Sequence, residues 1–254
     1  MTRFPLSAVL LACAALSPLA HASGVLPETS VVLVDEADRE ASINVQNTDS
    51  QPTLLYTTIQ NVPEDPANLV TVTPPVARVE PGQSQLVRFV LTNSTPLKTE
   101  RLKRVTFEGI PPANTSQSRV QITVRQNLPV ILHPKGLKPN DAPWTGLRWS
   151  LQNGALRVTN PSPYVVRLSQ QVALLPSQTP LLLPHPYILP GEQLKAIREP
   201  KRSDAAGAPG ASTTAPAAPL PADASGVRLY PATTYGFTVQ RYDAAIAAPS
   251  AAGQ

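Results

Sequence analysis

Short segments in which apolar and polar residues alternate follow one another through the first half of the chain. Residues 41–45 (Ala-Ser-Ile-Asn-Val) and 120–124 (Val-Gln-Ile-Thr-Val) alternate strictly, as the two faces of a half-buried strand require. Clusters of Pro, Gly, Asn and Asp separate such segments at intervals of roughly 8–12 residues, which predicts a β-sandwich. The other strands predicted for this half are 31–34, 54–59, 85–91 and 102–107.

A second set of strands follows a pause in this pattern. Residues 133–143 combine Pro, Gly, Asn and Asp, so a boundary between two domains is predicted there. Each half then has about 110 residues, close to the size of one immunoglobulin-like sandwich. We therefore predict an all-β protein with sandwiches at residues 23–133 and 134–243. The strands predicted for the second sandwich are 147–151, 155–159, 164–175, 193–197, 227–230 and 235–242.

Two segments have a composition that does not favour a packed core. Residues 203–226 are nearly all Ala, Pro, Gly, Ser and Thr, and residues 244–254 are similar. Such segments bury too little apolar area to offset the entropy that is lost on ordering. We expect a disordered insertion between strands of the second domain, and a disordered tail.

Residues 1–22 have the parts of a secretory signal peptide. Arg3 precedes an apolar run over residues 6–19, and alanines stand at positions 20 and 22, before the expected cut. One alternative is a transmembrane anchor, for which the run is short and interrupted by proline. Another is a lipoprotein cut before Cys13. Cleavage after residue 22 removes Cys13, the only cysteine, so the exported chain would have no disulfide.

Composition and charge narrow the range of functions. Proline accounts for 30 of 254 residues, which argues against a mainly helical chain, while 42% hydrophobic residues suffice for a real core. The net charge is only +4 and basic residues do not cluster, so no nucleic-acid partner is expected. Beyond residue 22, no segment is long and apolar enough for membrane insertion to be expected.

No arrangement of residues indicates catalysis. His133 and His185 are the only histidines after the leader, and both adjoin prolines, as loop residues often do. The chain has neither the spaced His and Cys residues of a metal site nor the G-x-S-x-G turn of a serine hydrolase. We therefore predict a protein that is not an enzyme and that has no catalytic residue, no metal and no cofactor, although the members of a triad can be scattered in sequence.

Four short motifs occur in a fixed order along the chain. Residues 72–89 contain Thr-Pro-Pro, then an Arg, a Pro-Gly turn and a Val-Arg strand. Ile-Pro-Pro follows at 110–112, Asn-Pro-Ser-Pro-Tyr at 160–164 and Tyr-Gly at 235–236. Their order and spacing resemble those of the PapD-like family, the periplasmic chaperones of the chaperone–usher pilus pathway. The resemblance extends over residues 24–242, apart from the Ala/Pro-rich insertion.

This resemblance implies a boomerang of two immunoglobulin-like sandwiches, hinged near residues 133–136. It also implies a periplasmic chaperone that binds pilus subunits, lends each an edge strand and delivers it to an outer-membrane usher. The matching donor strand is 119–128, on which Val120, Ile122 and Val124 share one face. Periodicity alone favours the interpretation in which these three side chains fill the core of the chain itself, as they would in any sandwich strand.

The sequence departs from the family at the residues that hold the C-terminal carboxylate of the subunit. The family's Arg and Lys fall at Val31 and Pro129, so neither base is present. The substitutes that we consider are an arginine and an amide on the donor strand and two hydroxyls near the first strand: Arg125, Asn127, Thr29 and Ser30. Arg125 is equally well explained as a charge that keeps an exposed strand edge in water.

The family's charge cluster between the domains is also incomplete. Glu100 matches it, whereas His133 stands where Arg is usual and Thr234 stands where Asp is usual. The alternative functions are an adhesive pilus subunit and a secreted hydrolase. A subunit would be a single incomplete sandwich, often with a disulfide, and a hydrolase would need a histidine constellation. Two complete sets of strands without a cysteine favour the chaperone.

Overall fold

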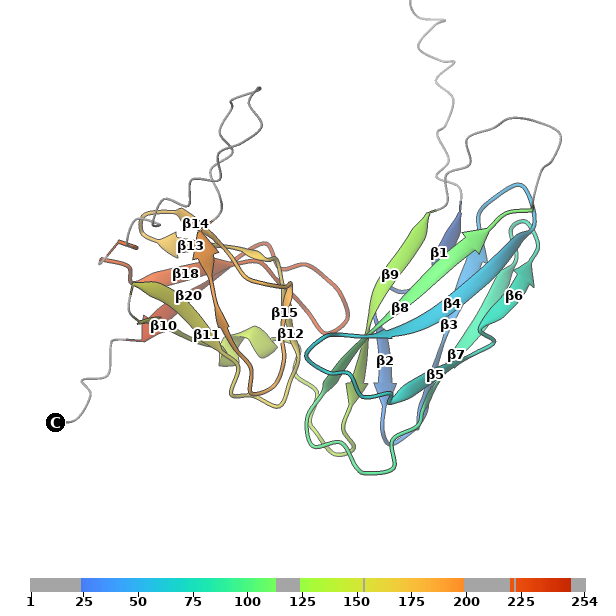
Figure 1. Cartoon of the computed structure of the whole chain (residues 1–254), viewed down its shortest axis with the longest axis horizontal. Helices are drawn as coiled ribbons and strands as arrows, with labels where there is room; N and C mark the ends of the chain where they lie inside the picture. Colours follow the sequence, from blue (N-terminus) through green and yellow to red (C-terminus); the bar gives the residue numbers. More distant parts are fainter. Residues whose placement is uncertain (1–23, 113–123, 153, 199–219, 222, 248–254) are drawn as a thin grey trace, which may run out of the picture.

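The computed structural model describes residues 24–112, 124–152, 154–198, 220–221 and 223–247. Within them the chain forms two β-rich domains that lie side by side (Figure 1). The first domain comprises β1 to β9, and the second comprises a 3₁₀ turn, η1, followed by β10 to β20. The prediction of an all-β protein with two domains is confirmed.

Two sheets form the first domain. One has the order β1-β3-β7-β5, and the other has the order β2-β9-β8-β4-β6. Their pairings are antiparallel except for the parallel pairing of β2 with β9. The strands are β1 (Val25–Pro27), β2 (Val32–Asp35), β3 (Glu40–Asn47), β4 (Thr53–Asn61), β5 (Val70–Thr73), β6 (Val76–Val79), β7 (Ser84–Leu91), β8 (Arg101–Ile110) and β9 (Arg125–His133).

Alternation along these strands places every second side chain between the two sheets. In β3 and β7 the inward residues include Val45, Val87 and Phe89, none of which is more than 1% exposed. Val105 and Phe107 of β8 meet them from the opposite sheet and are fully buried. Burial contributes about 1.5–3 kcal/mol for each large apolar side chain. This apolar layer is therefore the main source of stability of the first domain.

The second domain has one large and one small sheet. The large sheet has the order β16-β11-β10-β20-β18-β13-β14-β17, and the small one has the order β15-β12-β19. Its core includes Trp149, Leu174 and Val227, which are at most 1% exposed. The elements are η1 (Pro143–Gly146), β10 (Arg148–Gln152), β11 (Ala155–Thr159), β12 (Val166–Leu168), β13 (Gln171–Leu175), β14 (Thr179–Leu182), β15 (Tyr187–Ile188), β16 (Gln193–Lys195), β17 (Ile197–Arg198), β18 (Gly226–Leu229), β19 (Pro231–Ala232) and β20 (Tyr242–Ala247).

The predicted strand at 235–242 and the predicted start of the disordered tail at residue 244 are both wrong. Residues 233–237 form a turn that is closed by a backbone hydrogen bond of 2.8 Å between its end residues. β20 then extends to Ala247 and pairs with β10 on one side and β18 on the other. Strands that are distant in sequence thus order a segment whose composition alone predicts disorder.

The end of the predicted insertion, 203–226, is also ordered. Leu220 packs against the core of the second domain, and the Ser225 N–H donates to the Leu175 carbonyl (3.0 Å) directly before β18 begins. Tertiary contacts again override local composition. The remaining residues that the sequence predicts to be disordered or cleaved lie outside the described part, at 1–22, 203–219, 222 and 248–254.

A small apolar cluster and a buried carboxylate join the two domains. Leu102 and Ile131 of the first domain pack with Val165 of the second, and each is at most 3% exposed. The linker after β9 is held by Glu36, whose carboxylate accepts the Lys135 N–H (3.0 Å). These contacts keep the end of β9 close to the second domain.

A buried ion cluster fixes the loop between β4 and β5. Lys103 of β8 is fully buried; its ammonium donates to the Asp65 carbonyl (2.6 Å) and lies 3.1 Å from the Asp65 carboxylate. Nε of Arg101 donates to the same carboxylate (2.7 Å). Burial opposes ionisation of Asp65, but the hydrogen bonds from Arg101 and Lys103 outweigh it and hold the pKa of Asp65 below its usual value.

We predict that Asp65→Asn destabilises the protein by about 3–5 kcal/mol, because it leaves the buried Lys103 ammonium without its counter-ion. Urea denaturation followed by circular dichroism would measure the change. Glu80→Gln is the matched control, since Glu80 also pairs with an arginine, Arg78 (2.8 Å), but both side chains are more than half exposed. Its loss should cost no more than about 1 kcal/mol. Equal effects of the two substitutions would contradict the prediction.

Candidate functional site

Strand β9 has one edge that is only partly covered. β8 pairs with it from Arg125 to Leu132, whereas β2 pairs with it only from Val130 onward. Among the described residues, no strand pairs with 125–129 on the β2 side. In Figure 1, β9 lies on the side of the first domain that faces the second. Backbone N–H and C=O groups along such an edge offer a template for another strand.

Side chains on one face of β9 continue beyond the core of the first domain. Alternate residues from Leu128 to Leu132 point into the core between the sheets. Val124 has the same parity, lies just before the strand and is 46% exposed. The sequence places Val120 and Ile122 on the same face, but both lie outside the described residues. Where the core ends, this face therefore presents apolar surface to solvent.

Exposed apolar side chains gather on the outer face of the same sheet. Leu54 of β4 lies opposite Ile110 of β8, and Tyr56 of β4 lies opposite Val76 of β6. Each is between 41% and 43% exposed. Sequence reasoning missed this patch because residue 55 is also a leucine, and a run without alternation does not tell which side chain faces water. Apolar patches of this kind are typical of interaction surfaces.

Arg125, a predicted carboxylate anchor, already has a carboxylate partner. Its Nε and a terminal nitrogen donate to Oε2 of Glu108 at 3.0 and 2.6 Å, and its side chain is 57% exposed. Arg125 and His133 are the two ends of β9, about 26 Å apart at about 3.3 Å per residue. The structure thus places Arg125 at the end of β9 that is remote from the junction between the domains.

The other three predicted anchors lie nearer the junction. Asn127 accepts from Arg104 at its side-chain oxygen (2.8 Å) and at its backbone carbonyl (3.0 Å). The Thr29 hydroxyl donates to the carbonyl two residues later (3.0 Å), and Ser30 is exposed. Gly236 of the second domain lies so close to Ser30 that a Cβ would clash with the serine hydroxyl, so only glycine fits there.

Arg104 is a cation of this region that sequence reasoning missed. It lies on β8 opposite Pro129, and its charge interacts with Tyr187 and Arg167 of the second domain. Burial lowers the pKa of Arg104, but a guanidinium is so strong a base that it stays charged. The only sequence signal was a pair of charged residues, Lys103 and Arg104, inside the predicted strand 102–107. The register between β8 and β9 brings it to the position where the family's Lys is expected.

The predicted pair of Glu100 and His133 joins the two domains. Glu100 is 3% exposed; its Oε1 lies 2.9 Å from Nδ1 of His133, and its Oε2 accepts the Val165 N–H of the second domain (2.8 Å). Nε2 of His133 lies 2.8 Å from the Leu137 carbonyl, so both ring nitrogens face acceptors. Burial lowers the pKa of His133, but the hydrogen bonds to Glu100 and Leu137 outweigh it and raise the pKa above its usual value. Burial also raises the pKa of Glu100, so the pair holds a proton more tightly than either group would in water. The resemblance to the family places an Arg at the position of His133.

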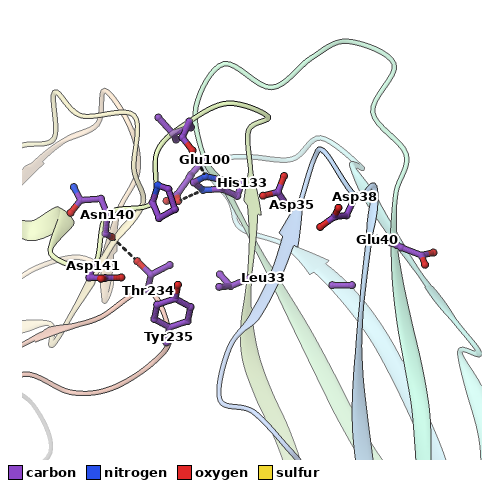
Figure 2. A pocket seen from close by; sticks show the side chains of 13 residues that line it. Leu33, Asp35, Asp38, Glu40, Glu100, His133, Asn140, Asp141, Thr234 and Tyr235 are labelled. Carbon is purple, nitrogen blue, oxygen red and sulfur yellow. Dashed lines mark hydrogen bonds and ion pairs between the residues drawn. The ribbon is translucent and has the colours of Figure 1, made fainter.

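A cleft of about 410 Å³ lies between the domains beside this pair. Figure 2 shows Thr234 and Tyr235 of the second domain facing Leu33 of the first. The Thr234 hydroxyl, at the position of the family's Asp, donates to the Asn140 carbonyl (2.9 Å) and so braces two loops of the second domain. Besides Glu100, the acidic residues that line the cleft are Asp35, Asp38, Glu40 and Asp141. His133 is the one basic side chain in this lining and is already paired with Glu100, so the surface of the cleft repels carboxylates.

One set of side chains in the described part of the chain could hold a metal ion. Glu64, His185 and Glu192 each bring a potential ligand atom within 4.8 Å of the other two. The sequence predicts no metal site, because these residues are far apart in the chain and no motif links them. No helix in the described ranges is long and apolar enough to cross a membrane.

The chain matches two family models in succession. Residues 24–138 match the N-terminal domain of PapD, a pili and flagellar-assembly chaperone, and residues 142–240 match the C-terminal domain of the pili assembly chaperone PapD. The chain therefore belongs to the PapD family, the non-enzymatic periplasmic chaperones that assemble pili in the chaperone–usher pathway. The fold class and the general function that the sequence motifs imply are confirmed.

Relatives and solved structures are similar over much of the chain. The uncharacterized fimbrial chaperone YhcA of Escherichia coli (strain K12) is 42% identical over 222 residues, which are 87% of this chain and 90% of that protein. Chaperone protein PapD of Escherichia coli is 29% identical over 157 residues, 58% of this chain and 64% of that protein. The CupB2 chaperone of Pseudomonas aeruginosa has a TM-score of 0.64 at 21% identity, covering 87% of this chain and 100% of that one. The likeness to this solved structure shows the fold.

We predict that the free energy of unfolding falls as the pH rises through neutrality, because His133 loses its proton. Its raised pKa means that the folded state holds this proton more tightly than the unfolded chain does. The stabilisation by the proton on His133 is complete below about pH 6.5, the pKa of histidine in the unfolded chain. It is lost as the pH rises through the pKa of His133 in the folded protein, by up to about 1.4 kcal/mol per pH unit. Urea titrations between about pH 6 and pH 8 would measure it. An unchanged slope in His133→Gln would contradict the assignment.

Proposed function

We propose that this chaperone binds a pilus subunit by adding the edge of β9 to the incomplete sheet of the subunit, and that it then delivers the subunit to an outer-membrane usher. The observation that carries the proposal is the uncovered edge of β9 over residues 125–129. The rest of β9, from Val130 onward, has β2 along this edge. Edge pairing supplies backbone hydrogen bonds, and alternate side chains select the partner. The partner would be a subunit that lacks one strand of its own.

Val120, Ile122 and Val124 are the side chains that we expect to fill apolar pockets of the subunit. Residues of this parity from Leu128 onward are already buried in the chaperone's own core. Val124 lies beyond that core, so nearly half of its surface is available to a partner. The side chains on one face of the strand would thus pack in the chaperone's own core at one end and in pockets of the subunit at the other.

We further propose that Arg104 supplies the positive charge that holds the subunit's C-terminal carboxylate. It would replace the Arg and the Lys of the family, whose positions are occupied here by Val31 and Pro129. The acidic lining of the cleft in Figure 2 disfavours binding of the carboxylate there. Arg104 stands opposite Pro129 on the neighbouring strand, so its guanidinium can serve the same stretch of β9. A charge-assisted pair of arginine and carboxylate is strong and geometrically specific.

Neutral donors complete this proposed anchor. The Asn127 side chain is already bonded to Arg104, and the hydroxyls of Thr29 and Ser30 lie just before β2, which covers the next part of β9. Arg125 fits less well, because Glu108 neutralises it at the remote end of the strand. We therefore assign Arg125 the role of a solvated edge charge.

We predict that Val124→Asp abolishes the stabilisation of a co-expressed pilus subunit in the periplasm without changing the melting temperature of the chaperone. The aspartate would have to enter an apolar pocket, and burial of an unpaired carboxylate costs roughly several kcal/mol or more. Ile122→Asp should act in the same way. Subunit recovery after affinity purification, with circular dichroism melts of each variant, would measure both effects.

Leu86→Asp is the matched control for this substitution. Leu86 is also 46% exposed, but it lies on β7 of the other sheet, so the variant should retain the subunit. A Val124→Asp protein that melts much earlier yet still retains the subunit would show that Val124 belongs to the chaperone's own core. That result would overturn the proposed role of this face.

We predict that Arg104→Gln weakens subunit binding by about tenfold or more, since a hydrogen bond to a charged group contributes about 1.5–3 kcal/mol. Arg125→Gln is the matched control and should leave the affinity nearly unchanged, because Arg125 pairs with Glu108 in an exposed position. The double variant Thr29→Val with Ser30→Ala tests the hydroxyls. Competition binding with one purified subunit would rank these variants. A larger loss in Arg125→Gln than in Arg104→Gln would refute the assignment.

A further inference from the structure

Glu64, His185 and Glu192 form a cluster at a second point where the two domains meet. Glu64 lies in the loop after β4, whereas His185 precedes β15 and Glu192 precedes β16. Nε2 of His185 lies 3.4 Å from Oε1 of Glu64 and 3.2 Å from Oε1 of Glu192. None of the three residues belongs to β9 or to the Glu100–His133 pair, although Tyr187, which contacts two of them, also interacts with the charge of Arg104.

The second polar atom of each of these side chains is already engaged. Nδ1 of His185 lies 2.7 Å from the Tyr187 carbonyl, and the two rings stack with their centres 4.1 Å apart. Oε2 of Glu64 accepts the Tyr187 hydroxyl (2.7 Å), and Oε2 of Glu192 accepts the Leu189 N–H (2.7 Å). Contacts of this kind orient the ligands of a metal ion.

These bonds determine whether Nε2 of His185 and the Oε1 atoms of Glu64 and Glu192 face each other with lone pairs or with a proton. Because a carbonyl only accepts hydrogen bonds, Nδ1 of His185 carries the ring proton. In the neutral imidazole, Nε2 then presents a lone pair to two carboxylate oxygens, which carry lone pairs and negative charge as well. Such an arrangement is favourable only with a positive species between the three atoms. That species is a second proton on the ring or a metal cation.

We propose that a zinc ion occupies this position and links the two domains. Zn²⁺ neutralises both carboxylates with a neutral imidazole as its third ligand, whereas a proton leaves one negative charge unbalanced. The separations of 3.2 and 3.4 Å agree with the edge of about 3.3 Å in a tetrahedron of ligands about 2.0 Å from zinc. A set that includes imidazole suits zinc better than Mg²⁺ or Ca²⁺, which prefer oxygen ligands.

Both sides of the proposed site are held in place before an ion binds. Glu64 precedes Asp65, the buried carboxylate that pairs with Arg101 and Lys103. On the second domain, the side chains of His185 and Glu192 are only 15% and 16% exposed. A preformed arrangement of ligands lowers the cost of binding. An ion here would connect a fixed loop of the first domain to a fixed loop of the second.

Calorimetric titration of the untagged chain from residue 23 to residue 254 tests the site with ZnCl₂, and with MgCl₂ as the control ion. We expect one Zn²⁺ per chain and no comparable binding of Mg²⁺. His185→Gln and Glu192→Gln should each weaken zinc binding by about tenfold or more. His133→Gln is the matched control, because it removes the other histidine that follows the leader, and it should bind zinc like the wild type.

Hydrogen exchange tests whether the ion bridges the domains. Zinc should slow exchange in residues 62–66 and in residues 185–192 of the wild type, and Glu64→Gln should lose the effect in both segments. Protection of 185–192 alone would overturn the bridge. Equal zinc binding by the wild type and His185→Gln would mean that zinc binds elsewhere, and binding of Mg²⁺ equal to that of Zn²⁺ would mean that the carboxylates alone bind cations. Either result would overturn the proposed zinc site. Neither result depends on subunit binding.

Discussion

A strand inside a sheet needs partners for its backbone groups on both sides, and β9 has them for only part of its length. β2 is four residues long and pairs with the last four residues of β9. Where β2 covers it, β9 belongs to the core and ends at His133, on the junction with the second domain. Where β2 is absent, the same strand has a free edge. The short parallel pairing therefore decides where the core ends, where the second domain attaches and where a foreign strand can add.

The acidic cleft and Arg104 give two neighbouring regions opposite charge, although the net charge of the chain is only +4. Acidic side chains collect in the cleft between the domains, whereas Arg104 lies on the outer face of the sheet that carries β9. An arriving chain end with a negative charge is thus repelled from the cleft and attracted to the sheet. The apolar patch around Leu54 and Tyr56 lies on the same sheet and adds surface that favours contact over solvent.

Features that depend on local contacts could be predicted from the sequence, and features that depend on distant partners could not. Alternation over 41–45 predicts β3, because one-sided burial leaves a period of two in the chain itself. β20 has a composition that predicts disorder, and only pairing with β10 and β18 orders it. Arg104 reaches its position through the register of two strands. Glu100 and His133 were predicted through the resemblance to the family, while the anchor of the subunit stays a prediction.

The place of β20 in its sheet governs how the newly made chain matures. β20 is the last described strand in sequence, yet it lies between β10 and β18 in the middle of the eight-stranded sheet. Without β20, the sheet consists of two separate parts, β16-β11-β10 and β18-β13-β14-β17, and the core side chains beneath the missing strand are exposed. All strands of the first domain precede residue 134, and the second domain adds the cover over Leu102, Ile131 and Glu100. In a chain that is made from its N-terminus, every strand of the first domain is therefore present before the second domain can close its large sheet, which needs the residues up to Ala247.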